Sequence, residues 1–281
     1  MSADLHCHTK LSDGSVSIEE LVALGKAAGL TAIAVTDHDT LAGAMRGKML
    51  GERNGIQVIP GAEFSCRDGQ TGRNVHLLCY MPESPDRLQG LCKDIAARRK
   101  EAGLLMAGRV MKKYNLPKSL VQKWINGSTN LFKQHIMLAL MDAGYTTTVF
   151  GSLYDELFGQ NGWAKVSIEY PLVEDVLKAI GEAGGLAVLA HPYHYDSVHL
   201  IPKLARLGLD GVEVWHHSAN EEQRNHLIEL CKQYDLCMTG GSDFHGANSR
   251  DVNPIGSTVM EDAFLNRLLA AKSHKQKIQG K

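Results

Sequence analysis

Short apolar runs alternate with helical stretches along most of this chain, and this alternation restricts the folds that it can adopt. The runs are Asp4–His8, Thr31–Thr36, Ile56–Glu63, Asn74–Tyr80, Gly185–Ala190, Gly211–Trp215 and Leu236–Gly240. Strands that alternate with helices build parallel β/α units. Six or seven such strands in one chain favour a closed or nearly closed α/β barrel over an open sheet.

Helical patterns lie between these runs. Ser17-Ile-Glu-Glu20 is a capping box, in which the serine and glutamate side chains bond to each other's backbone N–H groups, and it predicts a helix running to Gly29. A second helix is expected over Thr40–Asn54. Three more helices are expected in the second half of the chain, at Leu172–Ala183, Leu200–Leu207 and Asn220–Tyr234.

Residues 85–165 interrupt this rhythm. They contain long helical patterns at Asp86–Tyr114 and Leu131–Ala143 but no convincing strand. We therefore expect one barrel domain made of residues 1–84 and 166–281, with residues 85–165 forming a helical insertion.

The insertion is strongly basic. Between Lys93 and Lys133 there are ten lysines and arginines and only two acids, which leaves a local charge of +8 in a chain of net charge −1. A solvated helix face normally mixes both signs, and this imbalance favours a lid that faces an anionic substrate. The basic C-terminal segment Lys272–Lys277 is instead expected to be a frayed tail.

Composition excludes several classes of protein. An apolar content of 44% and a net charge of −1 over 281 residues argue against disorder, and a pI near 6.9 argues against a general nucleic-acid-coating protein. No apolar run reaches the roughly 18 residues of a membrane span, and no secretory signal is recognisable. Six cysteines without a Cys-x-x-Cys pair suggest reduced thiols in a cytoplasmic protein.

The thirteen histidines are the unusual part of the composition. In Asp4-Leu-His6-Cys-His8 the side chains of a strand alternate, so His6 and His8 point to one side and Cys7 points away. Two imidazoles on one strand face can share a divalent cation. A lone His-x-His is weak evidence for metal, and its value here depends on the residues that accompany it.

Further histidines and acids end or line the other predicted strands. With the first pair they make nine residues: His6, His8, Asp13, His38, Glu63, His76, His191, Asp243 and His245. The C-terminal ends of barrel strands meet at one mouth, where these groups would repel one another or remain unpaired unless cations neutralised them. Nine ligands exceed the needs of one zinc ion, which implies two or three ions. Nitrogen and carboxylate ligands without thiolates suit Mn, Fe or Zn.

The motifs that carry these residues occur together in a known family. They are Asp4-Leu-His-Cys-His-Thr9, Ser12-Asp-Gly14, Thr36-Asp-His-Asp39, Gly61-Ala-Glu63, His76, Ala190-His-Pro192 and Gly241-Ser-Asp-Phe-His245. Their order and strand placement resemble the PHP (polymerase and histidinol phosphatase) family along nearly the whole barrel. The resemblance implies a distorted (β/α)7 barrel with a trinuclear metal centre.

The insertion after the fourth strand resembles one branch of that family, the small metal-dependent phosphoesterases. This branch includes nucleoside 3′,5′-bisphosphate phosphatases, some of which also trim RNA from its 5′ end, and a cyclic-phosphate dihydrolase. The histidinol-phosphate phosphatases are related but differ more in the insertion.

The resemblance also implies roles for the nine residues. A first ion would be held by His6, His8 and Asp243, and Glu63 would bridge it to a second ion. The second ion would be completed by His76 and His191, and a third would be held by Asp13, His38 and His245. A hydroxide bridging the first two ions would be the nucleophile, which makes Glu63 and Asp243 catalytic. Several cations around one water lower its pKa far enough to supply hydroxide at neutral pH.

Substrate-binding residues follow from the same resemblance. Lys133-Gln-His135 stands where the branch carries an Arg-x-His that grips a phosphate, and Arg99 matches another arginine of the insertion. His194 replaces a phosphate-binding arginine of related proteins. His217, or its neighbour His216 at the end of the same strand, could protonate the leaving oxygen. Trp163 and Tyr145 could stack on a base, although core packing is the favoured explanation for both.

We therefore predict an enzyme, a metal-dependent phosphoric ester hydrolase that removes the 3′-phosphate of a nucleoside 3′,5′-bisphosphate. A cyclic-phosphate dihydrolase or a histidinol-phosphate phosphatase would use the same metal chemistry with a different pocket. The expected partners are a small nucleotide-like phosphorylated substrate and short oligonucleotide 5′ ends, with no membrane. The sequence leaves the oligomeric state open.

Two other classes of function are weighed against this prediction. A metal-stabilised PHP barrel could serve as a non-catalytic interaction module, but no expected ligand is missing. An amidohydrolase also begins with His-x-His on a first barrel strand, but the lysine of its binuclear centre is absent, and the basic insertion favours phosphate.

Overall fold

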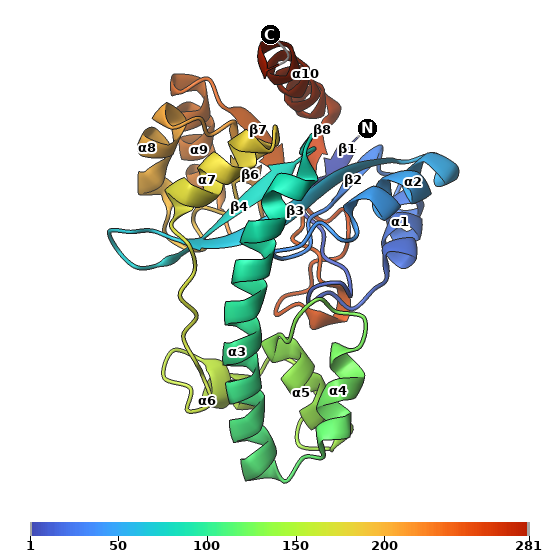
Figure 1. Cartoon of the computed structure of the whole chain (residues 1–281). Helices are drawn as coiled ribbons and strands as arrows, with labels where there is room; N and C mark the ends of the chain where they lie inside the picture. Colours follow the sequence, from blue (N-terminus) through green and yellow to red (C-terminus); the bar gives the residue numbers. More distant parts are fainter. Residues whose placement is uncertain (1, 280–281) are drawn as a thin grey trace.

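The structure is a computed structural model that describes residues 2–279. Its strands form one sheet in the order β7-β6-β5-β4-β3-β2-β1-β8. Their bounds are β1 Ser2–Asp4, β2 Ala32–Val35, β3 Gln57–Arg67, β4 Asn74–Tyr80, β5 Leu186–Leu189, β6 Gly211–Trp215, β7 Cys237–Gly240 and β8 Met260–Glu261. Helices flank this sheet on its outer side, as Figure 1 shows.

Backbone hydrogen bonds nearly close the sheet into a barrel. The segment after β1 meets the segment after β7: Leu5 N–H donates to Gly240 O at 3.0 Å, Phe244 N–H donates to His6 O at 3.1 Å, and His8 N–H donates to Phe244 O at 2.8 Å. The added strand β8 pairs antiparallel with β1. The predicted α/β class and distorted barrel are confirmed.

One strand breaks the parallel rhythm that the sequence predicts. Strand β4 is antiparallel to both β3 and β5, because a tight hairpin rather than a helix joins β3 to β4. The Asp68 carboxylate holds this hairpin by accepting from the N–H groups of Gln70 and Thr71. The expectation of parallel units throughout is therefore wrong for β4. Its reversed direction places His76, near the start of β4, opposite Ser65, near the end of β3.

The barrel helices agree with the sequence patterns within a few residues. They are α1 Ile18–Ala27, α2 Ala44–Asn54, α7 Val173–Glu182, α8 Ile201–Arg206 and α9 Glu221–Gln233. Ser17 and Glu20 form the predicted capping box at the start of α1. Helix α2 begins four residues later than expected. It packs closely on β3, where a Cβ atom at Gly51 would lie 2.4 Å from the Val58 side chain.

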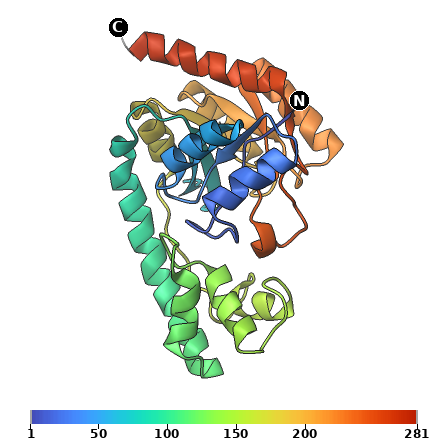
Figure 2. The same ribbon diagram turned by 90° about the vertical axis from the view of Figure 1, so that its right-hand side faces the viewer.

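The insertion forms a helical layer beyond the barrel mouth (Figure 2). A short 3₁₀ helix, η1 Pro85–Leu88, leads into it, and its helices are α3 Gln89–Tyr114, α4 Lys118–Ile125, α5 Lys133–Asp142 and α6 Ser152–Phe158. The insertion has its own core, in which Met106 and Val110 of α3 pack with Ile136 and Leu140 of α5 and Leu157 of α6. The long α3 runs from the barrel into this layer and ties the two parts together.

The C-terminal segment is helical rather than frayed. Helix α10, Asp262–Gln279, lies at the end of the barrel away from the insertion (Figure 1). Lys272 is buried and donates to Glu83 Oε1 at 2.6 Å and to Gly184 O, while Lys275 pairs with Asp210 at 2.8 Å. These anchors explain why the expectation of a loose basic tail is wrong. Within the described residues no helix is long and apolar enough to cross a bilayer.

Candidate metal centre

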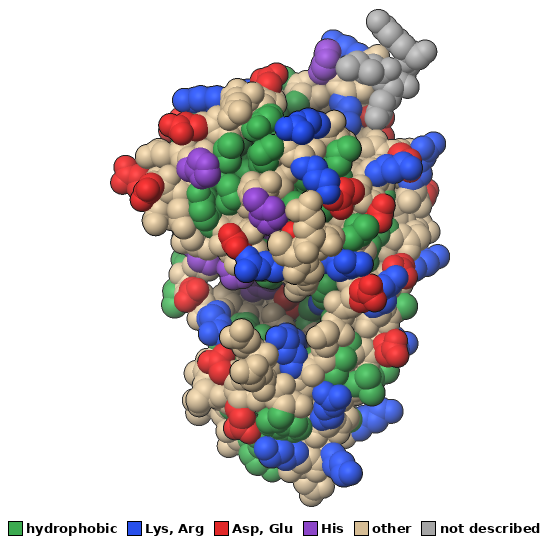
Figure 3. All heavy atoms as spheres, turned by 90° about the vertical axis from the view of Figure 1, so that its left-hand side faces the viewer, with side chains coloured by type: hydrophobic (Ala, Val, Ile, Leu, Met, Phe, Trp, Pro, Cys, Tyr) green, Lys and Arg blue, Asp and Glu red, His purple; other side chains and the backbone are tan. Residues whose placement is uncertain are grey.

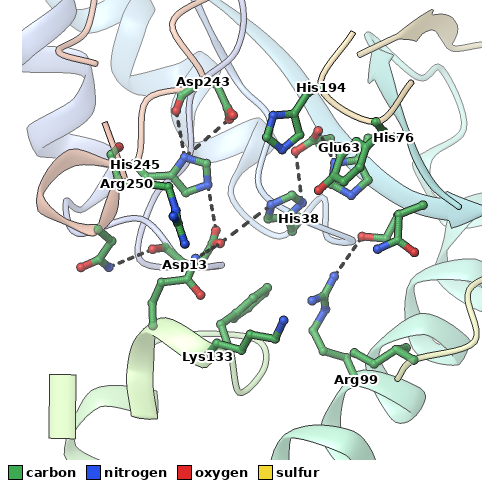
Figure 4. A pocket seen from close by; sticks show the side chains of 18 of the residues that line it. Asp13, His38, Glu63, His76, Arg99, Lys133, His194, Asp243, His245 and Arg250 are labelled. Atoms are coloured by element: carbon green, nitrogen blue, oxygen red, sulfur yellow. Dashed lines mark hydrogen bonds and ion pairs between the residues drawn. The ribbon is translucent and has the colours of Figure 1, made fainter. Parts of the chain in front are cut away.

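Glu63 lies at the centre of a cluster that contains all nine predicted ligands. The Glu63 carboxylate is buried near the middle of β3, and its two oxygens lie 2.7–3.3 Å from five imidazoles. These belong to His6, His8, His38, His76 and His191. Figure 4 shows His38 and His76 beside Glu63, with Asp13, Asp243 and His245 on the neighbouring side of the same cavity. The structure thus gathers side chains from strand ends that are far apart in the sequence.

Three overlapping groups of these side chains have ligand atoms within 4.8 Å of one another. The groups are His6-His8-Glu63-Asp243, His38-Glu63-His76 and His8-Asp13-His38-His245. Their overlap at His8, His38 and Glu63 means that ions held by them would be close neighbours. The cluster can therefore hold several divalent ions.

Unpaired buried atoms support the fit to metal. Among the described side chains, buried ring nitrogens of His6, His8, His38 and His191 and one oxygen each of Asp13 and Asp243 have no hydrogen-bond partner. A buried polar atom without a partner costs stability, and ligation of a cation would satisfy it. The donors are imidazole nitrogens and carboxylate oxygens, a set that suits Mn, Fe or Zn.

The electrostatics of the cluster also indicate that it attracts cations. Burial alone would raise the pKa of Glu63, but the surrounding imidazoles hold that pKa well below its ordinary value. Burial would lower the pKa of His8, but Asp243 and Glu63 outweigh it and raise that pKa to about 10. Burial prevails at His38, whose pKa falls to about 3. Without metal, the carboxylates thus draw a proton onto the His8 ring but not onto His38, and a metal ion bound at His8 must displace that proton.

A cavity of about 610 Å³ lies between the barrel mouth and the insertion. The cluster forms one wall, and the space-filling view in Figure 3 shows the hollow between the two parts with histidines exposed at its upper side. The insertion and the segment leading back from it contribute Arg99, Phe132, Lys133, Tyr154 and Lys165 to the other wall. The loop of residues 249–251 closes one side.

Comparison with known proteins agrees with this geometry. Residues 4–183 match the PHP domain family. The chain belongs to the PHP domain family. A phosphoribosyl 1,2-cyclic phosphate 1,2-diphosphodiesterase of Eggerthella lenta is 37% identical over 252 residues, which cover 89% of this chain and 96% of that protein. A 3′,5′-nucleoside bisphosphate phosphatase of Chromobacterium violaceum is 29% identical, over 89% of this chain and 90% of that protein.

Solved structures of similar shape include a protein of Bifidobacterium adolescentis named as a candidate metal-dependent phosphoesterase. Its TM-score is 0.86 at 27% identity, and the match covers 96% of both chains. The PHP chain described here is thus an enzyme, a metal-dependent phosphoesterase, as predicted. The comparisons span several substrates and do not distinguish among them.

The four predicted substrate-binding residues of this PHP protein have different surroundings. Lys133 lines the cavity and has no hydrogen bond or ion pair within the described part of the chain. Burial, with Lys165 and Arg99 nearby, lowers the pKa of Lys133 to about 8. Arg99 also lines the cavity, but it donates to Asp39 at 2.6 Å and to Ser65 at 2.9 Å, so its charge is largely neutralised.

The remaining two are histidines. His194 lines the cavity, and burial with His191 nearby lowers its pKa to about 4, which leaves the ring neutral. His135 is buried and is not among the residues that line the cavity. Its Nδ1 accepts from the N–H of Phe132 at 3.2 Å, so it caps the start of α5. The third residue after the N-cap of a helix reaches back in this way, and this bond occupies Nδ1 of His135.

Most of the basic charge of the insertion does not face the cavity. Of the ten lysines and arginines counted in the sequence, only Arg99 and Lys133 line it. Others form exposed ion pairs, such as Arg98 with Asp94 at 3.0 Å and Lys123 with Asp142 at 2.7 Å. The helices turn most of these side chains outward, so two of the ten cations, rather than the whole +8 charge, lie on the cavity wall.

Some residues near the centre are absent from the sequence-based set. Glu213 of β6 is buried beside His6, and Lys165 and Arg250 line the cavity. An acid inside the apolar run Gly211–Trp215 was the signal for Glu213, whereas nothing in the sequence singled out Lys165 or Arg250.

The two adjacent histidines after β6 differ in position. His217 lines the cavity, where the Asn253 side chain contacts its ring at 3.2 Å. His216 is buried, and its Nε2 lies 3.6 Å from Asp243 Oδ2. The Nδ1 of His216 accepts from Ser218 N–H at 3.2 Å, which places the ring proton of a neutral His216 on Nε2, toward Asp243. His217 is the more accessible of the two to a leaving group.

Proposed function

We propose that this enzyme hydrolyses phosphate esters in a small substrate that carries two phosphate groups. The observation that carries the proposal is the difference between the two cavity walls. The barrel side holds the nine proposed metal ligands, most of which line the cavity, and the insertion wall offers Lys133 with Lys165. The phosphoryl group being cleaved would lie at the first wall, and a second, non-reacting phosphate would lie at the other.

The proposed ligands of three ions are those of the sequence-based assignment: His6, His8, Asp243 and Glu63; Glu63, His76 and His191; and Asp13, His38 and His245. Bound divalent ions supply a water of lowered pKa and neutralise charge on the phosphoryl oxygens. Imidazole and carboxylate donors favour Mn, Fe or Zn. Asp243 and Glu63 contribute to two tasks, holding the cation site and keeping the imidazoles around them oriented.

The chain's own cations would fix the second phosphate. Among residues 2–279, Lys133 has no carboxylate partner, and the side chain of Lys165 has only a long contact of 3.5 Å to Gln160 O, so both can donate to an anion. Binding a phosphate there stabilises the protonated form of Lys133, whose pKa of about 8 lies close to neutrality. Remote binding of this kind positions the scissile group and improves turnover as well as affinity. His217 is the proposed donor to the leaving oxygen.

A phosphoribosyl 1,2-cyclic phosphate is the first substrate candidate. The relative with this activity in its name is 37% identical, against 29% for the bisphosphate phosphatase, and each match covers 89% of this chain. Such a substrate has one phosphate on the ribose and a second that bridges two ribose oxygens. Trp163 and Tyr145, the sequence-based candidates for base stacking, do not line the cavity, which favours a sugar phosphate.

A nucleoside 3′,5′-bisphosphate is the second candidate. It fits the same pattern of one reacting and one remote phosphate, and the aromatic rings of Phe150 and Tyr154 do line the cavity. A base could stack on one of these rings. Arg250 lies over both, at 5.4 and 5.5 Å from the ring centroids, and it would have to share them with a base.

The test measures kcat/KM with Mn²⁺ for four compounds: phosphoribosyl 1,2-cyclic phosphate, adenosine 3′,5′-bisphosphate, ribose 1,2-cyclic phosphate without the 5-phosphate, and adenosine 3′-monophosphate. We expect the cyclic substrate to be best, and each compound with two phosphates to exceed its one-phosphate partner at least tenfold. A higher value for the bisphosphate would promote the second candidate. Equal values within both pairs would contradict the proposal of a second phosphate site, and a 5′-phosphorylated dinucleotide tests action on oligonucleotide ends.

A further inference from the structure

A buried carboxylate outside the nine ligands lies directly behind the metal cluster. Glu213 is the third residue of β6, and its neighbours Val212 and Val214 point into the core beneath the helices. Because side chains alternate along a strand, Glu213 points the other way, into the barrel. It is 1% exposed, so its charge is withdrawn from water and needs partners within the protein.

Both oxygens of Glu213 contact residues of the cluster. Oε1 lies 2.9 Å from Nδ1 of His6, and Oε2 accepts from the backbone N–H of His191 at 2.8 Å. These two residues come from opposite parts of the sequence, His6 after β1 and His191 after β5. One carboxylate therefore joins two ligand-bearing segments.

The contact to His6 determines which ring nitrogen faces the metal site. A carboxylate only accepts hydrogen bonds, so Nδ1 of His6 carries the hydrogen, and the lone pair of a neutral ring is on Nε2. That Nε2 lies 3.3 Å from Glu63 Oε2 and 3.4 Å from Asp243 Oδ1, and it has no hydrogen-bond partner. The ring is thus held in the one tautomer whose Nε2 lone pair could ligate a cation bound beside those two carboxylates.

The contact to His191 holds a strained backbone. His191 has a φ of 27°, a conformation that side-chain-bearing residues rarely adopt. From this backbone position its side-chain Nε2 lies 2.8 Å from Glu63 Oε1. A hydrogen bond from its N–H to a buried carboxylate stabilises the segment where the strain occurs.

His8 offers a contrast within the same cluster. Within the described residues both of its ring nitrogens lack a hydrogen-bond partner, and the carboxylate on its Nδ1 side, that of Asp13, is 4.0 Å away. Nothing comparable to Glu213 therefore selects a tautomer of His8. The support is specific to His6 and His191.

We infer that Glu213 is a positioning residue for the metal centre, which fixes the tautomer of His6 and the backbone of His191 so that both present Nε2 to the cation site. Hydrogen-bond partners of this kind raise metal affinity by orienting the ligands. The inference concerns how the protein holds its ions and is independent of which phosphate ester it cleaves.

The decisive variant is Glu213→Gln. A glutamine amide has one accepting oxygen and one donating NH₂, so it cannot accept at both His6 and His191. If the glutamine NH₂ faces His6, Nδ1 of that ring must accept, and the ring hydrogen moves to Nε2. If the NH₂ faces His191, two N–H donors point at each other and the hydrogen bond is lost. We expect Mn²⁺ affinity, measured by calorimetric titration of chelator-treated protein, to fall about 10–100-fold. Glu213→Asp, which keeps two accepting oxygens, should recover part of this loss.

Asp210→Asn is the matched control. Asp210 precedes β6, and its carboxylate also accepts a backbone N–H from β5, that of Ala187 at 2.8 Å. Its other side-chain partner is Lys275 of α10, and among the described residues it has no hydrogen bond or ion pair to the cluster. We expect its circular dichroism and Mn²⁺ affinity to match wild type. Wild-type Mn²⁺ affinity in folded Glu213→Gln would overturn the inference, as would equal losses in both variants.

A measurement on the wild-type protein covers the case in which Glu213→Gln does not fold. Long-range ¹H–¹⁵N NMR of histidine-labelled, metal-free protein reports which nitrogen of each ring carries the hydrogen, and a His6→Gln variant assigns the His6 signal. We expect hydrogen on Nδ1 of His6, whether or not Nε2 is also protonated. A ring with hydrogen on Nε2 alone would overturn the inference.

Discussion

The two walls of the cavity are built on different principles. On the barrel wall, side chains from most of the strand ends crowd together, and their ligand atoms lie within a few ångströms of one another. On the insertion wall, Lys133 has no hydrogen-bond or ion-pair partner among the residues that the structure describes, and Arg99 is paired with Asp39 of the barrel. The first wall is a connected network, whereas the second is a small number of separate cations.

This difference determines what a substitution at each wall should do. Removing one member of a connected network leaves its buried neighbours unpaired, so the effect spreads beyond the altered side chain. Removing a separate cation takes away one contact and leaves the rest in place. Loss of a residue of the cluster should therefore affect metal binding and catalysis together, while loss of Lys133 should affect only the substrate contact.

The largest effect is expected from Asp243→Asn. Asp243 Oδ1 lies 3.1–3.4 Å from the rings of His6 and His8, and an amide in its place removes the negative charge that attracts the cation. We expect phosphate release to fall on the order of 10²–10³-fold, with less Mn²⁺ bound per chain in metal analysis. Cys7→Ala is the control, because Cys7 packs with the α1 side of the barrel, and it should keep its metal and most of its activity. Equal activity in the two variants would contradict the network description.

The second effect is a steep dependence of metal affinity on pH. The pKa of His8 is raised to about 10, so at pH 6–8 its ring is protonated in metal-free protein and must lose that proton to bind a metal ion. Affinity should therefore fall as pH falls, by about tenfold per pH unit for each displaced proton. Mn²⁺ titrations at pH 6, 7 and 8 in buffers of different ionisation enthalpy measure this. A pH-independent affinity would show that the rings are neutral before binding.

On the other wall, Lys133→Ala should weaken a single contact. A hydrogen bond to a charged group contributes about 1.5–3 kcal/mol, so the preference for a two-phosphate substrate over its one-phosphate partner should fall about 10–100-fold. Metal content should stay at the wild-type value. Lys123→Ala is the control, because it removes the same charge from the same insertion at a residue that pairs with Asp142 away from the cavity. It should change neither the substrate preference nor the metal content. Loss of bound metal in Lys133→Ala would contradict the claim that the two walls act separately.

A smaller effect concerns the charge of Lys133. Its lowered pKa of about 8 means that the side chain is a cation below that pH and loses its charge as pH rises through it. KM for the two-phosphate substrate should thus rise several-fold between pH 7 and 9. Lys133→Arg keeps its charge over this range. A rise of KM in the arginine variant as steep as in wild type would assign the pH effect to another group.

The smallest effect is expected from His135→Ala. Since His135 caps α5 and does not line the cavity, its removal should lower the stability of the insertion by about 0.5–2 kcal/mol and leave kcat/KM near the wild-type value. Thermal unfolding and steady-state kinetics measure the two quantities. A large loss of kcat/KM without a loss of stability would indicate that His135 contacts the substrate.

The same contrast explains which features could be predicted from the sequence. Side chains alternate strictly along a strand and strand ends meet at the barrel mouth, so His6, His8 and His38 could be placed together from their positions in apolar runs. Helices of the insertion carry no such constraint, because their rotation depends on tertiary packing. The outward direction of Arg98 and Lys123, the capping role of His135 and the pairing of Arg99 with Asp39 could therefore not be predicted.

Two features of the barrel also differ from the predictions made from the sequence. A strand that follows a hairpin is antiparallel, and the short turn between Arg67 and Asn74 was the available signal for the reversal of β4. The C-terminal helix is anchored by the contacts of Lys272 with Glu83 and Gly184. These residues are distant in sequence, so the basic composition of the segment alone predicted a frayed tail.

The barrel closes between the segments after β1 and β7 through a few backbone hydrogen bonds, and metal ligands lie on both sides of that junction. His6 and His8 belong to one side, and Asp243 and His245 to the other. A bound ion would therefore cross-link the two edges, and the cross-link would be lost when the ion leaves. The junction would open least often when the ions needed for catalysis are bound. Amide hydrogen exchange at His8 and Phe244 should slow when Mn²⁺ is added, while exchange in the β3–β4 hairpin ladder should change little.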